Sequence, residues 1–460
     1  MQARRISLDT LNERIAALGE GVPDGATYQE FSGLVLDHPA VGRLSALDPF
    51  SPEYRALAME LYRALSGRQE GYEPARDEQS HLALPDNIWT GLTPWSFRHP
   101  ALIAEFLASW ARIFRLLDLP PGGTARVLEY GCGTGQLLLM LARAGLEAHG
   151  VDIDSASLDA ARRQAEALGL ELRLEQAAFG EGFGEERFDR IIFFEAFHHA
   201  WEFPALLGRL RDRLAPEGRI ILCGEPVVPG PTDAVPFPWG PRLDALSIFC
   251  MRRWGWMELG FRHDFLVEAC RRAGWRVTFH PDAECGRAAA YVLQSALDGV
   301  IRMGEPQELG RYAAGWSAPE GTHRWTLGGT AIFPLPGQPG EALEVTLRMM
   351  NPLPVRKQVR ITAGEKAWTL TMEPGELGRD IALATEGAAE IGIQAEGHRP
   401  AGLIPGSADQ RLLGIAVVSI QCRTRIGRSG MEPAGSAALR SGSAEEGGRR
   451  LRRESCGGCA

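Results

Sequence analysis

ARVLEYGCGTGQLLLMLARAGLEAHGVDID, residues 125–154, is the stretch that decides the fold of this chain. Its apolar run at 127–129 is typical of a buried parallel strand. Three glycines at alternate positions follow, and glycine permits the positive φ and the close backbone approach that a ligand-binding turn needs. We expect a helix over 136–144 and a second strand over 148–151 that delivers Asp152. The pattern predicts a nucleoside-binding βαβ unit, in which an acid at this place binds a ribose hydroxyl.

The spacing of the glycines indicates the kind of cofactor. A dinucleotide site usually reads G-x-G-x-x-G and places a pyrophosphate at the helix N-terminus, whereas here G-x-G-x-G follows Glu129. A carboxylate at this point repels a phosphate and suits a cationic ligand. The run Glu129-Tyr130-Gly131-Cys132-Gly133-Thr134-Gly135, together with Asp152, resembles the class I S-adenosylmethionine-dependent methyltransferases.

The resemblance implies a role for each part of this motif. The glycine loop lies under the methionine part of S-adenosylmethionine, Asp152 binds both ribose hydroxyls, and the sulfonium methyl points into a substrate cavity. An Asp-Ala pair often contacts the adenine in this family, but this chain has Gln176, Ala177, Ala178 and Phe179 there, which leaves the adenine contact open. The cofactor-binding residues implied are Glu129, Tyr130, Gly131, Cys132, Gly133, Gly135, Asp152, Ile153, Ala177, Ala178 and Phe194.

Length and composition restrict the class of protein. The chain has 460 residues, of which 45% are hydrophobic and 23% charged, so it is globular and long enough for two or three domains. A net charge of -9 without a basic stripe argues against nucleic acid as a partner. The eight cysteines are scattered, which indicates a reducing compartment rather than a disulfide framework. Because no segment is long and apolar enough for a signal peptide or a membrane span, we expect a cytoplasmic protein.

The expected fold class is α/β: a Rossmann-like, seven-stranded methyltransferase sheet with an N-terminal helical cap, followed by an all-β sandwich. We place the cap at 1–85, the methyltransferase domain at 86–304, the β-sandwich at 305–424 and a disordered tail at 425–460. The tail contains a lone C-x-x-C, Cys456 and Cys459, which without a second cysteine pair does not indicate a metal site.

Periodicity places the elements within these domains. In the cap, helices are expected over 8–18 and 52–65, with Asp48 and Ser51 as capping candidates. In the second domain, Ser155 is the expected cap of a helix that ends at Gly169, and Gly218 the expected end of a helix that opens at Pro204. Further expected elements are a helix over 101–116, strands over 170–174, 191–194 and 220–223, and a late antiparallel hairpin, 275–280 with 288–293.

The catalytic candidates follow the fourth and fifth strands, because ligands of open α/β sheets bind outside the carboxyl ends of the strands. A hydroxyl acceptor must lose its proton, and histidine is suited to accept it. We therefore predict His198 or His199 as the base, with Glu195 or Glu225 orienting it; the alternative is that the histidine pair is structural. Adjacent histidines are poorly spaced for metal ligation on a helix and show no third ligand, so no metal is expected.

Two aromatic segments are candidates for the acceptor pocket. Trp89, Trp95 or His99 either line it or pack the cap on the core. Residues 226–262, which we call the lid segment, form a long connection rich in Pro, Trp and Met. Its tryptophans at 239, 254 and 256 either stack on a sugar ring or form a buried patch.

From 315 to 422 short alternating segments predict six or so strands, at 325–333, 343–349, 355–361, 367–372, 391–395 and 413–422. The segments 315–320 and 409–417 resemble the ends of accessory β-domains on enzymes of bacterial surface-polysaccharide assembly. That resemblance implies a saccharide acceptor, whereas a scaffold or oligomerisation domain is the alternative.

The predicted function is transfer of a methyl group from S-adenosylmethionine to an oxygen, a sugar hydroxyl of a glycan or glycan precursor. The alternatives are a methyltransferase for a non-sugar small molecule and a catalytically inactive carbohydrate-binding or assembly factor. The expected partners are a small-molecule or glycan acceptor, and a second copy of the chain or a glycosyltransferase.

Overall fold

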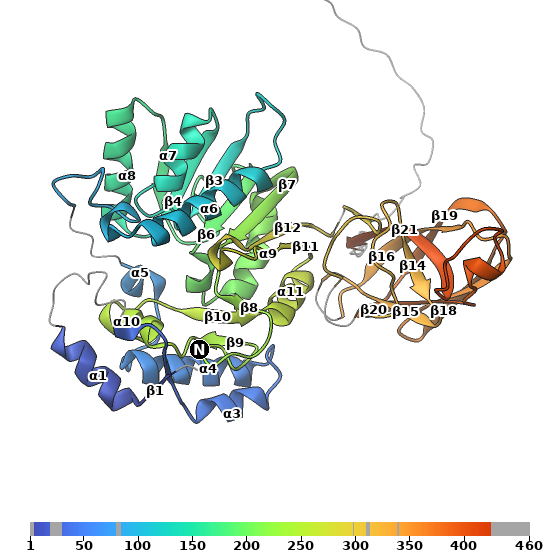
Figure 1. Cartoon of the computed structure of the whole chain (residues 1–460), viewed down its shortest axis with the longest axis horizontal. Helices are drawn as coiled ribbons and strands as arrows, with labels where there is room; N and C mark the ends of the chain where they lie inside the picture. Colours follow the sequence, from blue (N-terminus) through green and yellow to red (C-terminus); the bar gives the residue numbers. More distant parts are fainter. Residues whose placement is uncertain are drawn as a thin grey trace, which may run out of the picture. The chain divides into compact units, whose positions relative to one another are not determined.

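The computed structural model describes residues 4–18, 30–79, 84–297, 299–309, 313–337 and 340–424 (Figure 1). The predicted disordered tail at 425–460 lies outside the described residues. Among the described residues, no helix is long and apolar enough to cross a membrane.

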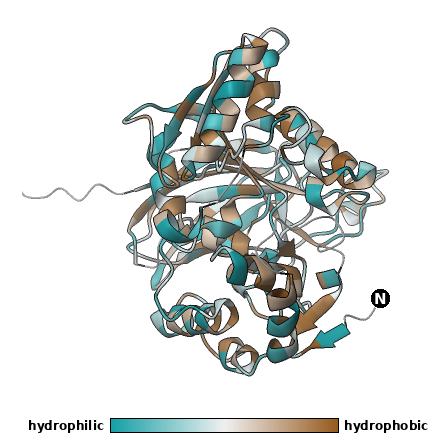
Figure 2. Cartoon of the chain, turned by 90° about the vertical axis from the view of Figure 1, so that its left-hand side faces the viewer, coloured by the Kyte–Doolittle hydropathy of each residue, from teal (hydrophilic) through white to brown (hydrophobic). Residues whose placement is uncertain are grey.

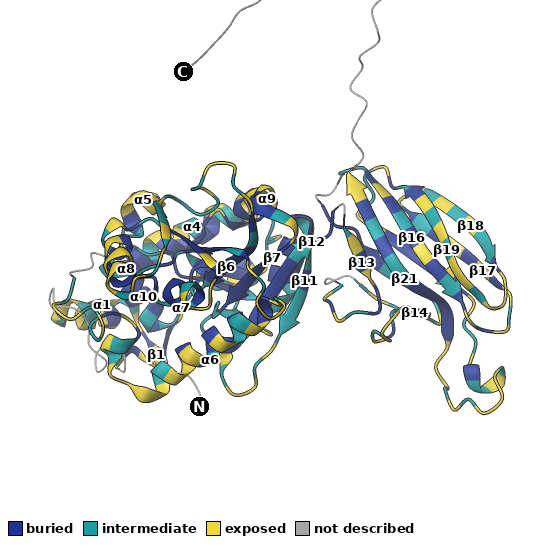
Figure 3. Cartoon of the chain, turned by 90° about the horizontal axis from the view of Figure 1, so that it is seen from above, coloured by how far each residue is buried: buried dark blue, intermediate teal, exposed yellow. Residues whose placement is uncertain are grey.

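A seven-stranded sheet forms the centre of the first half, in the order β11-β12-β7-β6-β3-β4-β5. Strands β3 to β7 are parallel, and β12 runs antiparallel to both β7 and β11. Its central strands β6 and β7 are largely buried (Figure 3). The predicted Rossmann-like sheet with a late antiparallel hairpin is therefore present. Its strands are β3 (Arg126–Tyr130), β4 (Glu147–Asp152), β5 (Arg173–Gln176), β6 (Phe188–Phe194), β7 (Leu214–Cys223), β11 (Trp275–His280) and β12 (Ala290–Ser295).

Amphipathic helices connect and flank these strands, as the mixed teal and brown colouring of Figure 2 shows. They are α6 (Pro100–Leu116), α7 (Gln136–Arg143), α8 (Ser155–Leu168), α9 (Phe203–Arg213) and α11 (His263–Arg272), with short 3₁₀ turns η1 (Trp95–Phe97), η2 (Phe197–His199) and η3 (Gly286–Ala288).

Two expected element ends are wrong. Asp154 rather than Ser155 caps α8, because its carboxylate accepts the Ser157 N–H at 2.9 Å. Helix α9 ends at Arg213 and Gly218 lies inside β7, since Leu214 already pairs with Phe188 of β6. Strand pairing, which sequence periodicity does not reveal, sets this second boundary.

The N-terminal cap contains α1 (Leu8–Ala17), α3 (Ala40–Ser45), α4 (Pro52–Ser66) and α5 (Pro74–Asp77). Ser51 caps α4 as predicted, accepting the Tyr54 N–H at 3.1 Å. The cap is not wholly helical, however, because β1 (Arg4–Ile6) and β2 (Leu34–Leu36) form a small parallel sheet.

The lid segment is ordered and contacts the cap. It contributes β8 (Val227–Val228), β9 (Trp239–Pro241), α10 (Ala245–Arg253) and β10 (Leu259–Arg262), with the three strands in one sheet. The Tyr54 hydroxyl of α4 donates to the Trp239 carbonyl at 2.6 Å. The N-terminal cap therefore packs against the lid segment and does not only cover the sheet.

The C-terminal region is β-rich and contains two antiparallel sheets. Buried side chains of both sheets, such as Val345 and Ile361, belong to one hydrophobic cluster, and the strands alternate buried and exposed residues (Figure 3). The strands are β13 (Val300–Arg302), β14 (Arg324–Leu327), β15 (Thr330–Pro334), β16 (Leu343–Asn351), β17 (Lys357–Ala363), β18 (Lys366–Met372), β19 (Glu376–Ala384), β20 (Glu390–Ala395) and β21 (Leu413–Thr424), with the turn η4 (Pro400–Gly402).

The expected strands in this region need three corrections. The run 325–333 is two strands in different sheets, separated at Gly328. β19 was not expected, because charged and glycine residues hide its alternation. β13 pairs with β21, so this region begins before the predicted boundary at 305.

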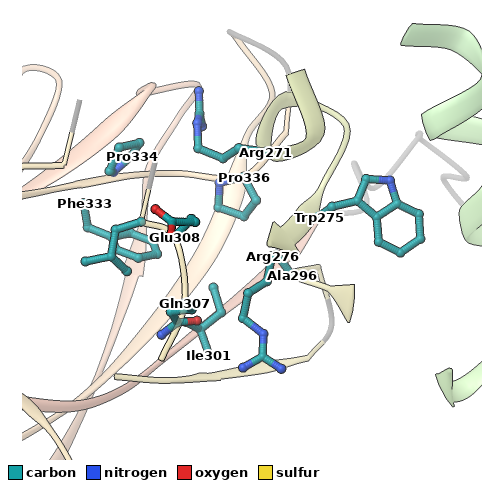
Figure 4. A pocket seen from close by; sticks show the side chains of 11 residues that line it. Arg271, Trp275, Arg276, Ala296, Ile301, Gln307, Glu308, Phe333, Pro334 and Pro336 are labelled. Carbon is teal, nitrogen blue, oxygen red and sulfur yellow. The ribbon is translucent and has the colours of Figure 1, made fainter. Parts of the chain in front are cut away.

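A crevice beside β11 is too small to be a ligand site. It is lined by residues of α11, β11 and the first part of the β-rich region (Figure 4). Its volume of about 20 Å³ holds roughly one water molecule. Arg276 of β11 lines it and pairs with Glu305 at 3.3 Å.

Lys357 gives the β-rich region a testable pH dependence. Its side chain is fully buried, and Nζ donates to the carbonyls of Glu396 at 2.5 Å and Leu413 at 3.2 Å. Burial lowers the pKa of Lys357 from 10.5 to about 8. The unfolded chain then binds more protons than the folded chain between these values, so the contribution of Lys357 to stability rises with pH from about 8 to 10.5.

We expect Lys357→Met to remove this rise. The difference in unfolding free energy between the wild type and Lys357→Met, measured by denaturant titration, should therefore grow across that pH window. The control is Lys366→Met, because Lys366 is exposed and pairs with Glu386 at the surface. Parallel stability curves for wild type and Lys357→Met would contradict the assignment.

Candidate functional site

The glycine loop joins β3 to α7 and needs glycine for two reasons. Gly131, Gly133 and Gly135 have φ of 69°, 49° and 74°, which side chains with a Cβ rarely adopt. A Cβ on Gly131 would lie 2.7 Å from the Ala196 Cβ, and one on Gly135 would lie 2.7 Å from the Ala161 Cβ. The loop is therefore pressed against its neighbours on one side and leaves its other side to a ligand.

Asp152 holds this loop in place. Its carboxylate accepts the Gly133 N–H at 2.7 Å and the Asp154 N–H at 2.9 Å. Burial raises the pKa of Asp152, although these backbone N–H groups oppose the effect. The side chain predicted to bind ribose thus also fixes the shape of the glycine loop.

Glu129 is a buried carboxylate that suits a cationic ligand. It is 3% exposed, and its Oε2 has no hydrogen-bond partner among the described residues. Burial, with the nearby Asp152 carboxylate, raises the pKa of Glu129 well above its usual range. A buried acceptor without a partner is costly, so this oxygen fits a ligand that brings a donor, such as an ammonium group.

A cavity of about 560 Å³ extends from the glycine loop to the lid segment. This volume lies within the range of small-molecule sites. One part of the lining comes from the loop and from the ends of β4 and β5, and the other from η2, the cap and the lid segment. The lining residues are Tyr72, Pro74, Glu78, Thr93, Gly131, Gly133, Asp152, Ile153, Asp154, Ser157, Ala177, Ala178, Phe179, Glu195, Ala196, His199, Ala200, Trp201, Glu202, Leu206, Arg209 and Trp256.

Six of the predicted cofactor residues line this cavity: Gly131, Gly133, Asp152, Ile153, Ala177 and Ala178. The other five, Glu129, Tyr130, Cys132, Gly135 and Phe194, do not. Tyr130 stacks on Phe193 in the core, Cys132 is buried, and Phe194 packs edge-on against Trp110. Motif reasoning cannot separate residues that contact a ligand from residues that pack the motif against the core.

Glu225, one of the two carboxylates predicted to orient a histidine, contacts His198. Its Oε2 lies 2.8 Å from the His198 Nδ1 and accepts the His198 N–H at 3.0 Å. Its Oε1 accepts the N–H groups of Ala196 and Phe197. Glu195, the other alternative, pairs with Arg287 instead.

His199 lines the cavity and is held by a residue that the sequence did not reveal. Its Nδ1 lies 3.3 Å from Glu78 Oε2, and the other Glu78 oxygen accepts from the Tyr72 hydroxyl and the Met257 N–H. Burial lowers the pKa of His199, but Glu78 and two further carboxylates outweigh that effect and raise it to about 9. Nothing in the sequence around Glu78 marks it as a site residue, because its partner belongs to a distant part of the chain.

The candidate acceptor aromatics divide between the cavity and the core. Of the three lid tryptophans, Trp256 lines the cavity, Trp254 stacks on it with ring centroids 4.5 Å apart, and Trp239 is 2% exposed. Trp201 also lines the cavity and was not among the candidates. The tryptophan argument for a sugar therefore rests on Trp256 rather than on three residues.

The side chains of the loop before α6, residues 86–99, mainly have structural roles. Trp95 donates to Gln136 Oε1 at 2.9 Å, and His99 accepts the Leu102 N–H at 3.1 Å as the cap of α6. Trp89 is 44% exposed. Thr93 is the residue of this loop that lines the cavity.

Comparison with known proteins agrees with this geometry. Residues 127–218 match a family model described as a methyltransferase domain. A demethylmenaquinone methyltransferase of Thermus thermophilus is 38% identical over 107 residues, which are 23% of this chain and 49% of that protein. A ubiquinone biosynthesis O-methyltransferase of Rhodopseudomonas palustris is 30% identical over 97 residues, 21% of this chain and 38% of that protein. The chain thus spans half or less of the length of these curated relatives.

Part of this chain is also similar to solved structures. A Burkholderia thailandensis 1,6-didemethyltoxoflavin-N1-methyltransferase, with S-adenosylhomocysteine bound, is 19% identical and matches 56% of this chain and 92% of its own, with a TM-score of 0.31. The family match and the glycine loop together show a methyltransferase domain that uses S-adenosylmethionine.

Replacing Asp152 tests the cofactor site. We expect Asp152→Ala to weaken binding of S-adenosylhomocysteine about 10- to 100-fold, since hydrogen bonds to a charged group contribute about 1.5–3 kcal/mol. Isothermal calorimetry measures this directly. The matched control is Asp189→Ala, whose carboxylate also accepts a backbone N–H, that of Arg126, but at the opposite end of β3 and β6. Equal losses in both variants would mean that a general loss of stability, and not a lost cofactor contact, causes the effect.

Proposed function

We propose that this chain transfers the methyl group of S-adenosylmethionine to a hydroxyl oxygen of a small acceptor. The observation that carries the proposal is that one cavity joins the glycine loop and Asp152 to His199 and Trp256. A methyl donor bound at the glycine loop and Asp152 presents its sulfonium to an acceptor bound beside His199 and Trp256.

The reaction needs few groups from the protein. An oxygen lone pair of the acceptor attacks the methyl carbon, the carbon–sulfur bond breaks, and the sulfonium becomes a neutral thioether. The hydroxyl proton leaves to a basic group or to water. Because the displacement is in line, the main contribution of the protein is to hold the acceptor oxygen and the methyl carbon close together and aligned. Such orientation lowers the activation barrier by about 7–11 kcal/mol in favourable cases.

His198 and His199 are the residues that we propose to act on the acceptor hydroxyl. Glu225 orients His198 and Glu78 orients His199. Glu195 lines the cavity while paired with Arg287, so we propose no proton-transfer role for it.

The acceptor proposed from the sequence is a sugar hydroxyl of a glycan or glycan precursor. Trp256 at the cavity wall supports it, because a sugar ring stacks on an indole face. A second candidate is a phenol-type hydroxyl, which the aromatic surroundings of Tyr72, Trp201 and Trp256 also favour. The Rhodopseudomonas palustris relative is named an O-methyltransferase of ubiquinone biosynthesis, which supports transfer to an oxygen.

Acceptor panels separate these classes. Full-length protein is incubated with S-adenosylmethionine and with panels of glycans, nucleotide sugars and phenolic compounds, and methylated products are identified by mass spectrometry. Methylation of a saccharide oxygen supports the first class, and methylation of a phenol oxygen the second. A folded protein that binds the cofactor but methylates neither panel would contradict the proposal and favour the inactive binding factor.

Replacing Trp256 tests the acceptor half of the cavity separately from the cofactor half. We expect Trp256→Leu to lower kcat/KM for the acceptor about tenfold or more, because misplacing an acceptor reduces the fraction of productive complexes. Binding of S-adenosylhomocysteine should stay unchanged. Trp89→Leu serves as the control, since Trp89 is 44% exposed and does not line the cavity. Unchanged acceptor kinetics in Trp256→Leu would show that the acceptor lies elsewhere.

A further inference from the structure

The histidine pair lies beside a third potential metal ligand. His198 and His199 form the turn η2 after β6, and Glu258 precedes β10 at the end of the lid segment. One ligand atom from each of the three residues lies within 4.8 Å of the others, and His198 Nε2 is 3.9 Å from Glu258 Oε2. Ligands around a tetrahedral zinc ion lie about 3.4 Å apart, so small side-chain rotations bring these atoms to coordination distance.

The tertiary structure removes both sequence arguments against a metal. Adjacent histidines are badly placed on an α-helix, but this pair is in a 3₁₀ turn, with ring centroids 4.2 Å apart. The third ligand comes from a segment that is distant in sequence. Both His198 and Glu258 are nearly buried, at 8% and 7% exposed.

Carboxylates behind the histidines are arranged as in metal sites. Glu225 already accepts three backbone N–H groups, so it is anchored before it contacts the imidazole of His198. A carboxylate at Nδ1 favours the proton on that nitrogen, which leaves the Nε2 lone pair directed toward Glu258. Metal-binding histidines commonly have such a carboxylate behind them.

The charge around this cluster also favours a cation. Glu225, Glu258 and Glu78 bring three carboxylates to the two histidines. Arg242 lies 3.8 Å from Glu258, but its Nε pairs with Asp244 at 2.8 Å and is thus shared. An ion between His198 Nε2 and Glu258 would neutralise part of this negative charge.

We propose that His198, His199 and Glu258 bind a divalent transition-metal ion of the Zn²⁺ type. Two imidazoles and one carboxylate form the donor set of many catalytic zinc sites, which keep an open position for a further ligand. Imidazole ligands disfavour Mg²⁺ and Ca²⁺, which prefer oxygen. His199 also lines the cavity, which places the cluster next to the proposed acceptor.

This inference deepens the proposed function and rests on it for the identity of the further ligand. The ion would hold the hydroxyl oxygen of the acceptor and favour its deprotonated form. Both imidazoles would then be ligands rather than bases, and the hydroxyl proton would leave to water.

The test measures metal binding without relying on activity. Untagged full-length protein carrying Cys456→Ser and Cys459→Ser, which removes the C-x-x-C of the tail, is treated with a chelator and titrated with Zn²⁺ by calorimetry. Co²⁺ is then added as a spectroscopic probe, because its visible absorption reports the ligands and their geometry. We expect one Zn²⁺ per chain and a Co²⁺ spectrum of nitrogen and oxygen ligands.

Variants locate the ion. Glu258→Gln keeps the size of the side chain and should weaken Zn²⁺ binding at least about 100-fold, as should His198→Asn. The matched control is Glu195→Gln, a cavity carboxylate outside the cluster, which should bind Zn²⁺ as the parent does. S-adenosylhomocysteine binding, measured on every variant, identifies any that has lost its fold.

The outcomes separate this proposal from the proposed function. Parent protein that binds S-adenosylhomocysteine but less than about 0.2 equivalents of Zn²⁺ overturns the metal site alone. Equal Zn²⁺ affinity in the parent and Glu258→Gln places the ion elsewhere and also overturns it. Stoichiometric Zn²⁺ binding that depends on Glu258, in a protein that methylates neither acceptor panel, supports the metal site and contradicts the proposed function.

Discussion

The hydrogen bonds that Asp152 makes to the glycine loop are the interaction on which the rest of the site depends. The three glycines of the loop have left-handed conformations, and the shape of the loop requires an external support. Asp152 provides it from the end of β4, the strand next to β3 in the sheet, by accepting the Gly133 N–H. A buried carboxylate is costly unless it is hydrogen-bonded, so the same contacts keep Asp152 stable and the loop in position. The parallel pairing of β3 and β4 makes this possible because it brings both strand ends to one edge of the sheet.

The acceptor half of the cavity is held together by contacts between distant segments rather than by one local motif. It is assembled from segments that are far apart in the chain: the end of β6, the lid segment and the N-terminal cap. Glu225 fixes the turn η2 by accepting N–H groups from three successive residues, and Glu78 comes from the cap to meet His199. Cap and lid also contact each other through Tyr54 and the Trp239 carbonyl. This half of the cavity is therefore built largely from parts of the chain outside the glycine-loop motif.

The concentration of carboxylates at this half distinguishes it from the cofactor half. Glu129 is a buried carboxylate whose Oε2 has no hydrogen-bond partner among the described residues, whereas Glu78, Glu225 and Glu258 surround two histidines. Asp152 and Asp154 in one half and Glu78 in the other bring carboxylates to the wall of a partly enclosed cavity, where electrostatic interactions are stronger than in water. A sulfonium cofactor in one half and a metal ion in the other are compatible with that charge. The β-rich region contributes no residue to the lining of this cavity in the described part of the chain.

The sequence by itself determined the parts of this protein that are local. Residues 125–154 predict strand, loop, helix and second strand because alternate glycines and apolar periodicity are properties of neighbouring residues. The five parallel strands of the seven-stranded sheet follow from repeating that unit. It also placed Asp152 at the end of the second strand and predicted the Glu225 support for His198, as one of two alternatives, and Ser51 as a helix cap. Only the tertiary structure decided that Tyr130 and Phe194 pack in the core, that Glu195 pairs with Arg287, and that Glu78 and Glu258 approach the histidines. The physical reason is that these contacts join residues far apart in the chain, and their distances are set by packing between elements, which no local pattern encodes.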